Sequence, residues 1–80
     1  MNWMRAMTVM LDGGRVTRKN WPPNKKLFIA HNPHDLGKPA PPIPNDQFPM
    51  LCLNETPPDR TDLNWLPEQE DIFGIDWEIV

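Results

Sequence analysis

The sequence predicts an α+β fold: an N-terminal helix packed on a small antiparallel β-sheet, with a long Pro-rich loop. Three observations predict it. An apolar pattern with helical spacing opens the chain, short segments rich in β-branched and aromatic residues follow, and 11 prolines interrupt the remainder. Eighty residues suffice for one domain, so residues 1–80 are expected to fold as a single unit.

The helix is expected between Asn2, a good N-terminal cap, and the glycine pair 13–14, which can supply the left-handed residue that ends a helix. Its apolar residues recur at steps of three and four and form one stripe: Trp3, Ala6, Met7, Met10 and Leu11. The segment GGR (13–15) is interpreted as this helix stop. It lacks the GK[ST] ending of a phosphate-binding loop, and it follows a helix rather than a strand.

Strands are expected at 15–18, 26–30, 50–54, 62–66 and 76–80, where β-branched and aromatic residues gather. Pro22 and Pro23 cannot donate to a ladder, so they end the first strand in a basic turn. Residues 68–73 fit a short helix that ends at Gly74. Residues 32–49 contain six prolines and are expected to form extended, polyproline-like pieces, as a flap over a site or an arm that reaches a neighbour.

Composition limits the classes of function. Cys52 is the only cysteine, which excludes a disulfide within the chain, and its apolar neighbours predict a buried thiol. A core this small favours a homo-oligomer. Residues 1–38 carry a charge of +5 and residues 39–80 carry −8, giving the net −3. This split suits self-association or a small anionic ligand, and it does not suit duplex nucleic acid. No apolar run is long enough to span a membrane, so a soluble, intracellular protein is expected.

Catalytic and metal sites are not expected. His31, His34 and Asp35 could contribute metal ligands, but their spacing matches no strong template, so we expect no metal. The acids between Trp65 and Trp77 fit the dipole of a short helix better than an acid–base pair. Since no nucleophile and base stand out, we expect neither an enzyme nor a cofactor.

The segment RKNWPPNKKLF (18–28) carries the strongest indication of a ligand. Cations bracket two aromatic residues in it: Arg18, Lys19, Lys25 and Lys26 around Trp21 and Phe28. Cations hold phosphates and aromatic faces stack on bases, so a nucleotide would suit this segment. The alternative is that Trp21 belongs to the core and the lysines form a solvated turn.

Motifs at both ends of the chain resemble the phage Thoeris anti-defence 2 family, small proteins formerly grouped only as a domain of unknown function. The opening motif comprises Trp3, Ala6, Met7, Met10, Gly13, Val16, Arg18 and Trp21, and the closing one comprises Trp65, Gln69, Asp71, Ile72, Phe73, Asp76 and Trp77. The match covers residues 1–30 and 62–80. The sequence departs from the family pattern at Asn20, at the two prolines after Trp21 and at Glu68, which caps a helix less well than the usual serine.

The resemblance implies a sponge that works in the host bacterial cytoplasm. Such proteins bind cyclic nucleotide signals of bacterial immunity, above all glycocyclic ADP-ribose, without cleaving them, and this blocks activation of the Thoeris effector. They assemble as homo-oligomers, typically tetramers, with pockets between subunits. Two other classes remain open: a protein-binding inhibitor of a host defence enzyme, and a small cyclic-nucleotide hydrolase that uses His31 and His34.

On this interpretation the ligand-binding residues are divided by chemistry. The diphosphate would meet Arg18 and one of Lys25 or Lys26, and adenine would stack on Trp21 or Phe28. The ribose hydroxyls would bind Asn24, Gln69 or Asp71, while Trp65 would meet the ligand or a neighbouring subunit. Trp77 and Ile79 are expected to pack the last strand on the N-terminal helix, and Asp76 to tie that strand to a backbone or basic partner.

Overall fold

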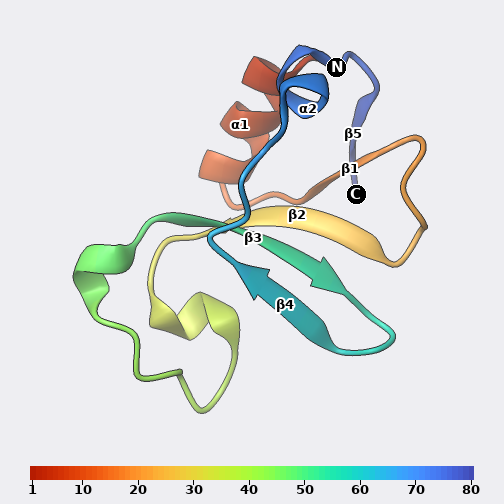
Figure 1. The fold of residues 1–80 in the computed structure, drawn as a ribbon. Helices are drawn as coiled ribbons and strands as arrows, with labels where there is room; N and C mark the ends of the chain where they lie inside the picture. The colour runs from red at the N-terminus through yellow and green to blue at the C-terminus, as the bar shows by residue number, and fades with distance from the viewer.

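The computed structural model describes residues 1–80 and shows a five-stranded antiparallel sheet with two α-helices (Figure 1). In chain order the elements are α1 (Trp3–Leu11), β1 (Val16–Arg18), β2 (Lys25–Ala30), the 3-10 helices η1 (Pro33–Leu36) and η2 (Asn45–Gln47), β3 (Met50–Glu55), β4 (Arg60–Leu63), α2 (Gln69–Phe73) and β5 (Trp77–Ile79). The predicted α+β class is confirmed. Neither α-helix has the length and apolar character needed to cross a membrane.

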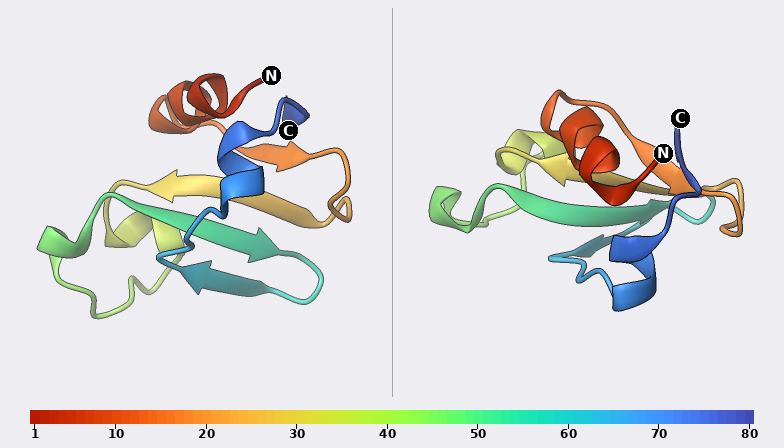
Figure 2. Two further views of the ribbon diagram at one scale, coloured as in Figure 1. Left: turned by 45° about the horizontal axis from the view of Figure 1, so that its top comes forward. Right: turned by 90° about the horizontal axis from the view of Figure 1, so that it is seen from above.

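The strand order is β4-β3-β2-β1-β5, and every neighbouring pair is antiparallel. The last strand therefore returns to lie beside the first, which brings both chain ends to one side of the sheet (Figures 1 and 2). Successive side chains of a strand point to opposite faces. One face, here the helix face, carries Val16, Leu27, Leu53 and Trp77 against α1.

The other face, here the open face, is covered at one end only. Its apolar end consists of Ala30, Met50 and Cys52, and residues from segment 32–49 pack on it: Leu36, Ile43 and Phe48. Cys52 is fully buried, as predicted. Segment 32–49 extends away from the two α-helices (Figures 1 and 2) and forms two 3-10 turns, where the sequence suggested extended pieces.

Three details differ from the sequence-based expectations. Leu11 is 55% exposed because it lies at the margin of the helical stripe, whereas Ala6 and Met10 at its centre are buried. Ile79 is 65% exposed on the outermost strand, so it does not share the core position of Trp77.

The third difference concerns the strand expected at 62–66. It runs instead over Arg60–Leu63, because Asn64 takes a left-handed conformation with φ of 54° that ends the ladder. The adjacent helix α2 starts directly after Glu68 despite the lack of a serine cap. The backbone N–H of Glu68 donates to Asp71 Oδ2 at 2.9 Å, which is one half of a capping box.

Candidate functional site

Arg18 lies in a network of ion pairs within the chain. Its Nη1 donates to Asp71 Oδ1 at 2.9 Å, and its Nε donates to Asp76 Oδ1 at 3.0 Å. The side chains of Arg18 and Asp71 are only 11% and 8% exposed, and the guanidinium carbon lies 5.6 Å from the centre of the Trp77 ring. The predicted link between Asp76 and a basic partner is confirmed. In this fold Arg18 joins β1 to α2 and to the residue before β5.

Hydrogen bonds and opposite charges within the network offset the cost of burying Arg18 and Asp76 in their charged forms. Burial alone would lower the pKa of Arg18, but hydrogen bonds to Asp76 and Asp71 and their charges more than offset this, so the pKa is raised. Burial alone would raise the pKa of Asp76, yet the hydrogen bond and charge of Arg18 bring it below its ordinary value. The raised pKa of Arg18 and the lowered pKa of Asp76 both favour the charged forms that make this ion pair.

The four tryptophans form one continuous aromatic chain on the helix face. The ring centres of Trp3 and Trp77 are 5.2 Å apart, those of Trp77 and Trp21 are 5.3 Å apart, and those of Trp21 and Trp65 are 6.0 Å apart. Trp77 is buried as predicted, and the other three are partly buried against the same core. Lys25 Nζ lies 4.8 Å from the centre of the Trp21 ring. Trp21 and Trp65 thus both contribute to packing.

The remaining predicted residues are distributed over different parts of the molecule. Asn24 Nδ2 donates to the carbonyl of Pro57 at 2.6 Å and so ties two turns together. Gln69 is exposed at the start of α2, and Lys26 lies on the open face, two residues before Phe28. Of the nine residues predicted for the site, only Phe28 lines a cavity.

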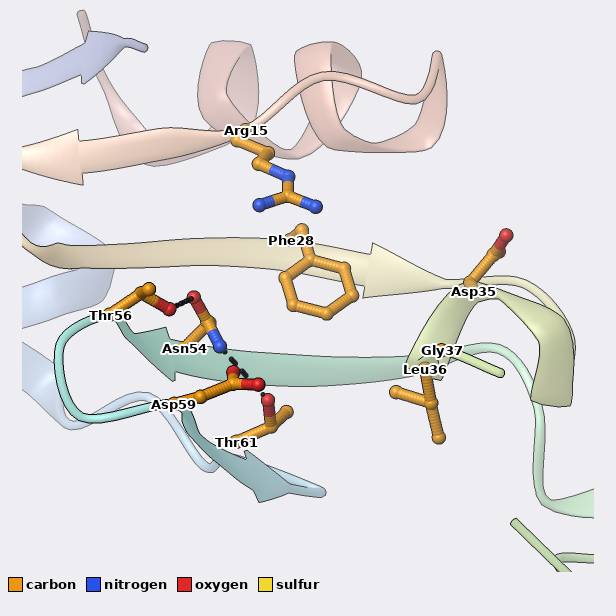
Figure 3. A pocket seen from close by; sticks show the side chains of 9 residues that line it. All are labelled: Arg15, Phe28, Asp35, Leu36, Gly37, Asn54, Thr56, Asp59 and Thr61. Atoms are coloured by element: carbon orange, nitrogen blue, oxygen red, sulfur yellow. Dashed lines mark hydrogen bonds between the residues drawn. The ribbon is translucent and has the colours of Figure 1, made fainter. Parts of the chain in front are cut away.

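That cavity lies on the open face and has a volume of about 310 Å³ (Figure 3). Its lining comes from the residue before β1, from β2, β3 and β4, and from the segments around η1 and the β3–β4 turn: Arg15, Phe28, Asp35, Leu36, Gly37, Asn54, Thr56, Asp59 and Thr61. A second cavity of about 190 Å³ shares Arg15, Phe28 and Asp35 with it. The two hollows therefore adjoin at the Phe28 ring, which is flat, apolar and accessible from this face.

A cation lies on one side of this ring. The guanidinium carbon of Arg15 is 5.1 Å from the centre of Phe28, and Figure 3 shows the guanidinium pointing at the ring from β1. Unlike Arg18, Arg15 takes part in none of the ion pairs of the chain, which involve only Arg18 and Arg60. Its charge is available to an anion that enters the cavity.

The opposite wall of the cavity is polar, and hydrogen bonds hold its side chains in place. Thr56 Oγ1 donates to Asn54 Oδ1 at 2.9 Å, and Asn54 Nδ2 donates to Thr61 Oγ1 at 3.0 Å and to the carbonyl of Arg60 at 3.2 Å. Both ends of the Asn54 amide are thereby oriented (Figure 3). Among the two acids of the lining, Asp35 Oδ2 accepts from the backbone N–H of His31 at 2.8 Å, whereas Asp59 takes part in no hydrogen bond or ion pair of the chain.

Strand register explains why these residues share a face. Val16 pairs with Leu27 on the helix face, so Arg15 and Phe28 both fall on the open face, next to each other across two strands. Lys26 pairs with Asn54, and Asn54 pairs with Thr61. A row of polar side chains thus crosses β2, β3 and β4 beside the row that contains Arg15 and Phe28.

Sequence reasoning missed Arg15, Asn54, Thr56 and Thr61. Arg15 was interpreted as part of a helix stop and of the strand expected at 15–18, and the two threonines fall between the strands expected at 50–54 and 62–66. Alternation within the strands does carry a signal for Arg15, Asn54 and Thr61. Once the register of neighbouring strands is known, these residues fall on the same face of the sheet as Lys26 and Phe28. Without the register, the sequence offers no way to bring the three strands together.

The histidine-containing segment does not gather a metal-binding cluster. No group of three or more His, Cys, Asp or Glu side chains in the structure has an arrangement that could hold a metal ion. His31 lines the smaller of the two adjoining cavities, and His34 lies on η1.

Comparison with known proteins gives one family. The model of the Thoeris anti-defense 2-like domain matches residues 1–80, the whole of the chain described here. No curated protein matches the chain significantly. The family match spans both motif-bearing ends and the proline-rich centre, which the sequence motifs did not cover.

Proposed function

Because this chain belongs to the Thoeris anti-defense 2-like family, we propose that it is a phage sponge: it binds a cyclic nucleotide immune signal of the glycocyclic ADP-ribose class and holds it without cleavage. The anti-defence role is that of the family. Sequestration in the host bacterial cytoplasm would keep the signal from the Thoeris effector.

The observation that supports this proposal best is the cavity with Phe28 as its floor and Arg15 beside it. A base stacked on an aromatic side chain gains about 1–3 kcal/mol. The contact between an exposed arginine and Phe28 contributes only about 0.5–1 kcal/mol, so a base can replace it. The displaced guanidinium is then available for a phosphate, with a charge-assisted hydrogen bond. Binding of a nucleotide would therefore use the Phe28 ring for the base and the Arg15 guanidinium for the phosphate.

The proposal keeps Phe28 and Lys26 from the predicted site and gives the role of principal cation to Arg15. Lys26 lies on the same face beside Asn54, its partner in the register, and does not line the cavity. Arg18 and Asp71 are already paired with each other, and recruiting Arg18 to a phosphate would leave two carboxylates without their partner. That cost makes Arg15 the better candidate on energetic grounds.

Binding without turnover is part of the proposal, with no cofactor. The lining of the larger cavity offers threonine hydroxyls and carboxylates but neither histidine nor cysteine, the commonest partners of an activated nucleophile. His31 lines the adjoining cavity, where only its backbone N–H bonds to a side chain, that of Asp35. To compete with an effector for a scarce signal, the dissociation constant should be nanomolar, about −12 kcal/mol.

A homo-oligomer, with a tetramer as the expected state, is the second component of the proposal. Only 11 of 80 residues are buried, so the core of one chain is small. A surface beside the start of α1 and the end of α2, here the α1–α2 surface, exposes Met4, Ile72, Phe73 and Ile75, and a cavity of about 300 Å³ lies within it. A second copy of the chain covering this surface would remove these side chains from water.

A capture-and-release experiment tests the function. The protein is incubated with glycocyclic ADP-ribose, free ligand is removed by filtration, and the retained fraction is heat-denatured and analysed by mass spectrometry. Recovery of the intact signal in the released fraction is the expected result.

Other outcomes identify the alternatives. A cleaved product would indicate a hydrolase and contradict sequestration. A signal left intact and entirely in the free fraction would contradict both, and would favour an inhibitor that binds a host defence protein.

A further inference from the structure

We infer that the polar wall formed by Asn54, Thr61 and Asp59 binds the vicinal hydroxyls of a ribose, so that a nucleotide lies across the sheet with its phosphates at Arg15 and its sugar at Asp59. This inference rests on the proposed function and specifies the orientation of the ligand. It assigns a role to three residues that belong to neither end motif.

The first step is the separation of charge along the cavity. The Arg15 guanidinium enters from the start of β1, whereas Asp59 lies in the turn between β3 and β4, on the other side of Phe28 (Figure 3). Adjacent strands are about 4.8 Å apart, so the path from β1 to β4 covers roughly 14 Å. Arg15 therefore supplies a positive charge at one side of the cavity and Asp59 a negative charge at the other, while the third charged residue of the lining, Asp35, lies on η1 and accepts from the His31 backbone. The separation of Arg15 from Asp59 suits an extended nucleotide better than a lone phosphate.

The second step is the chemistry of the negative end. An ionised carboxylate only accepts hydrogen bonds, so it repels a phosphate and attracts groups that donate. A vicinal diol presents two hydroxyl donors side by side, and a carboxylate serves this purpose in dinucleotide-binding folds. Asp59 forms no hydrogen bond or ion pair within the chain, whereas the Asp35 carboxylate already accepts from the His31 backbone.

The third step is the orientation of the amide. Asn54 Nδ2 donates to a backbone carbonyl, that of Arg60, which fixes which end of the amide is nitrogen. Thr61 Oγ1 accepts from this same nitrogen, so its own hydrogen is directed elsewhere and can serve a ligand. The Asn54 oxygen accepts one bond, from Thr56, and has capacity for another. The wall thus offers acceptors and one donor to a sugar without any rearrangement.

Titration calorimetry with ADP-ribose and with inorganic pyrophosphate tests the inference. The variants are Asp59→Asn, which removes the charge at constant size, and Thr61→Val, which removes the hydroxyl. The control is Asp46→Asn, which removes the same charge from an exposed acid on η2 that lines no cavity. Unfolding in urea confirms that each variant is folded.

The expected result is a crossover. Asp59→Asn should weaken ADP-ribose binding at least tenfold while pyrophosphate binding stays the same or tightens, because a like charge is removed. Thr61→Val should weaken ADP-ribose binding several-fold and leave pyrophosphate unaffected, and Asp46→Asn should change neither. The wild type should bind ADP-ribose more tightly than pyrophosphate.

Two results would overturn the inference. One is a folded Asp59→Asn variant that binds ADP-ribose as tightly as the wild type. The other is a wild type that does not prefer ADP-ribose to pyrophosphate, or binds neither. If the wild type still captures and releases intact glycocyclic ADP-ribose in either case, the proposed function stands and only the assignment of the wall is wrong.

Discussion

Arg15 lies just before β1 and Arg18 ends it, and the two side chains face opposite sides of the sheet. Arg18 points to the helix face, where Asp71 and Asp76 hold it and Trp77 packs beside it. Arg15 points to the open face, where it contacts only the Phe28 ring. Three positions along a strand reverse the direction of the side chain, so two similar residues acquire different roles.

These roles predict effects of very different size when each arginine is replaced by alanine. Arg18→Ala leaves the buried Asp71 carboxylate without its cation and should reduce the free energy of unfolding by about 3 kcal/mol. Arg15→Ala removes an exposed contact and should change it by less than about 0.5 kcal/mol. Urea denaturation followed by tryptophan fluorescence measures both, and equal stability of the two variants would contradict the structural role of Arg18.

Asp76 predicts a dependence of stability on pH. Its pKa is held below its ordinary value of 3.8 in the folded state, so the unfolded chain binds the proton more tightly. The stabilisation is therefore present above pH 3.8 and is lost as the pH falls through the pKa of the folded state. Denaturation between pH 2.5 and 6 should show a shallower slope for Asp76→Asn than for the wild type, while Asp46→Asn serves as the matched control; identical slopes in all three would exclude the mechanism.

At the scale of elements, the turn between α1 and β1 depends on Gly13. Its φ of 91° lies in the left-handed region, and nothing lies within 4 Å of the position that a Cβ would occupy. The residue is thus needed for its backbone conformation and not for space.

Gly13→Ala should therefore lower the free energy of unfolding by about 1 kcal/mol without changing the fold. Thermal unfolding by circular dichroism measures the loss. Gly37→Ala is the matched control. It makes the same substitution at a second glycine with a positive φ, 117°, in the segment outside the core. A Gly13→Ala variant as stable as the wild type would show that α1 ends differently.

Much of the fold could be predicted from the sequence because most elements have local signals. The 3.6-residue apolar period defined α1, the prolines after Trp21 placed the first turn, and Gly74 marked the end of α2. The end of β4 could not be predicted, since the left-handed conformation of Asn64 has no unambiguous signal. The exposure of Ile79 likewise depends on the order of the strands, which places β5 at the edge.

The residues of the cavity were harder to predict, for a physical reason. The segment 18–28 looked like one binding surface because its cations and aromatic residues are adjacent in sequence. In a hairpin, alternation sends Arg18 and Lys25 to the helix face and Lys26 and Phe28 to the open face. The cavity instead unites residues from β2, β3 and β4 with the residue before β1, and only the register brings Arg15, Phe28 and Asn54 together.

At the scale of the whole molecule, the two faces of the sheet have different roles. The helix face holds the aromatic chain and the Arg18 network, which stabilise the monomer. The open face is covered only at its apolar end and carries the hollow around Phe28. The α1–α2 surface shares no residue with this hollow, so self-association there would leave the proposed ligand site accessible. The proposed site then lies within one chain, whereas the family resemblance implies pockets between subunits.

Assembly can be tested on the α1–α2 surface. Phe73 is 73% exposed, and Phe73→Glu would place a charge where a second copy is proposed to pack. Sedimentation velocity should show a tetramer for the wild type and a smaller species for this variant. Leu66→Glu, at a residue that is 81% exposed and does not line the cavity of this surface, should leave the assembly intact. A monomeric wild type would contradict the proposal directly.

The central claim is that the open-face cavity holds the nucleotide, and calorimetric titration of Arg15→Ala with glycocyclic ADP-ribose tests it most directly. The variant should remain as stable as the wild type, yet bind at least tenfold more weakly, a loss of about 1.4 kcal/mol or more, because the phosphate loses its cation. A folded Arg15→Ala protein that binds the signal with the affinity of the wild type would contradict the claim and place the ligand elsewhere on the molecule.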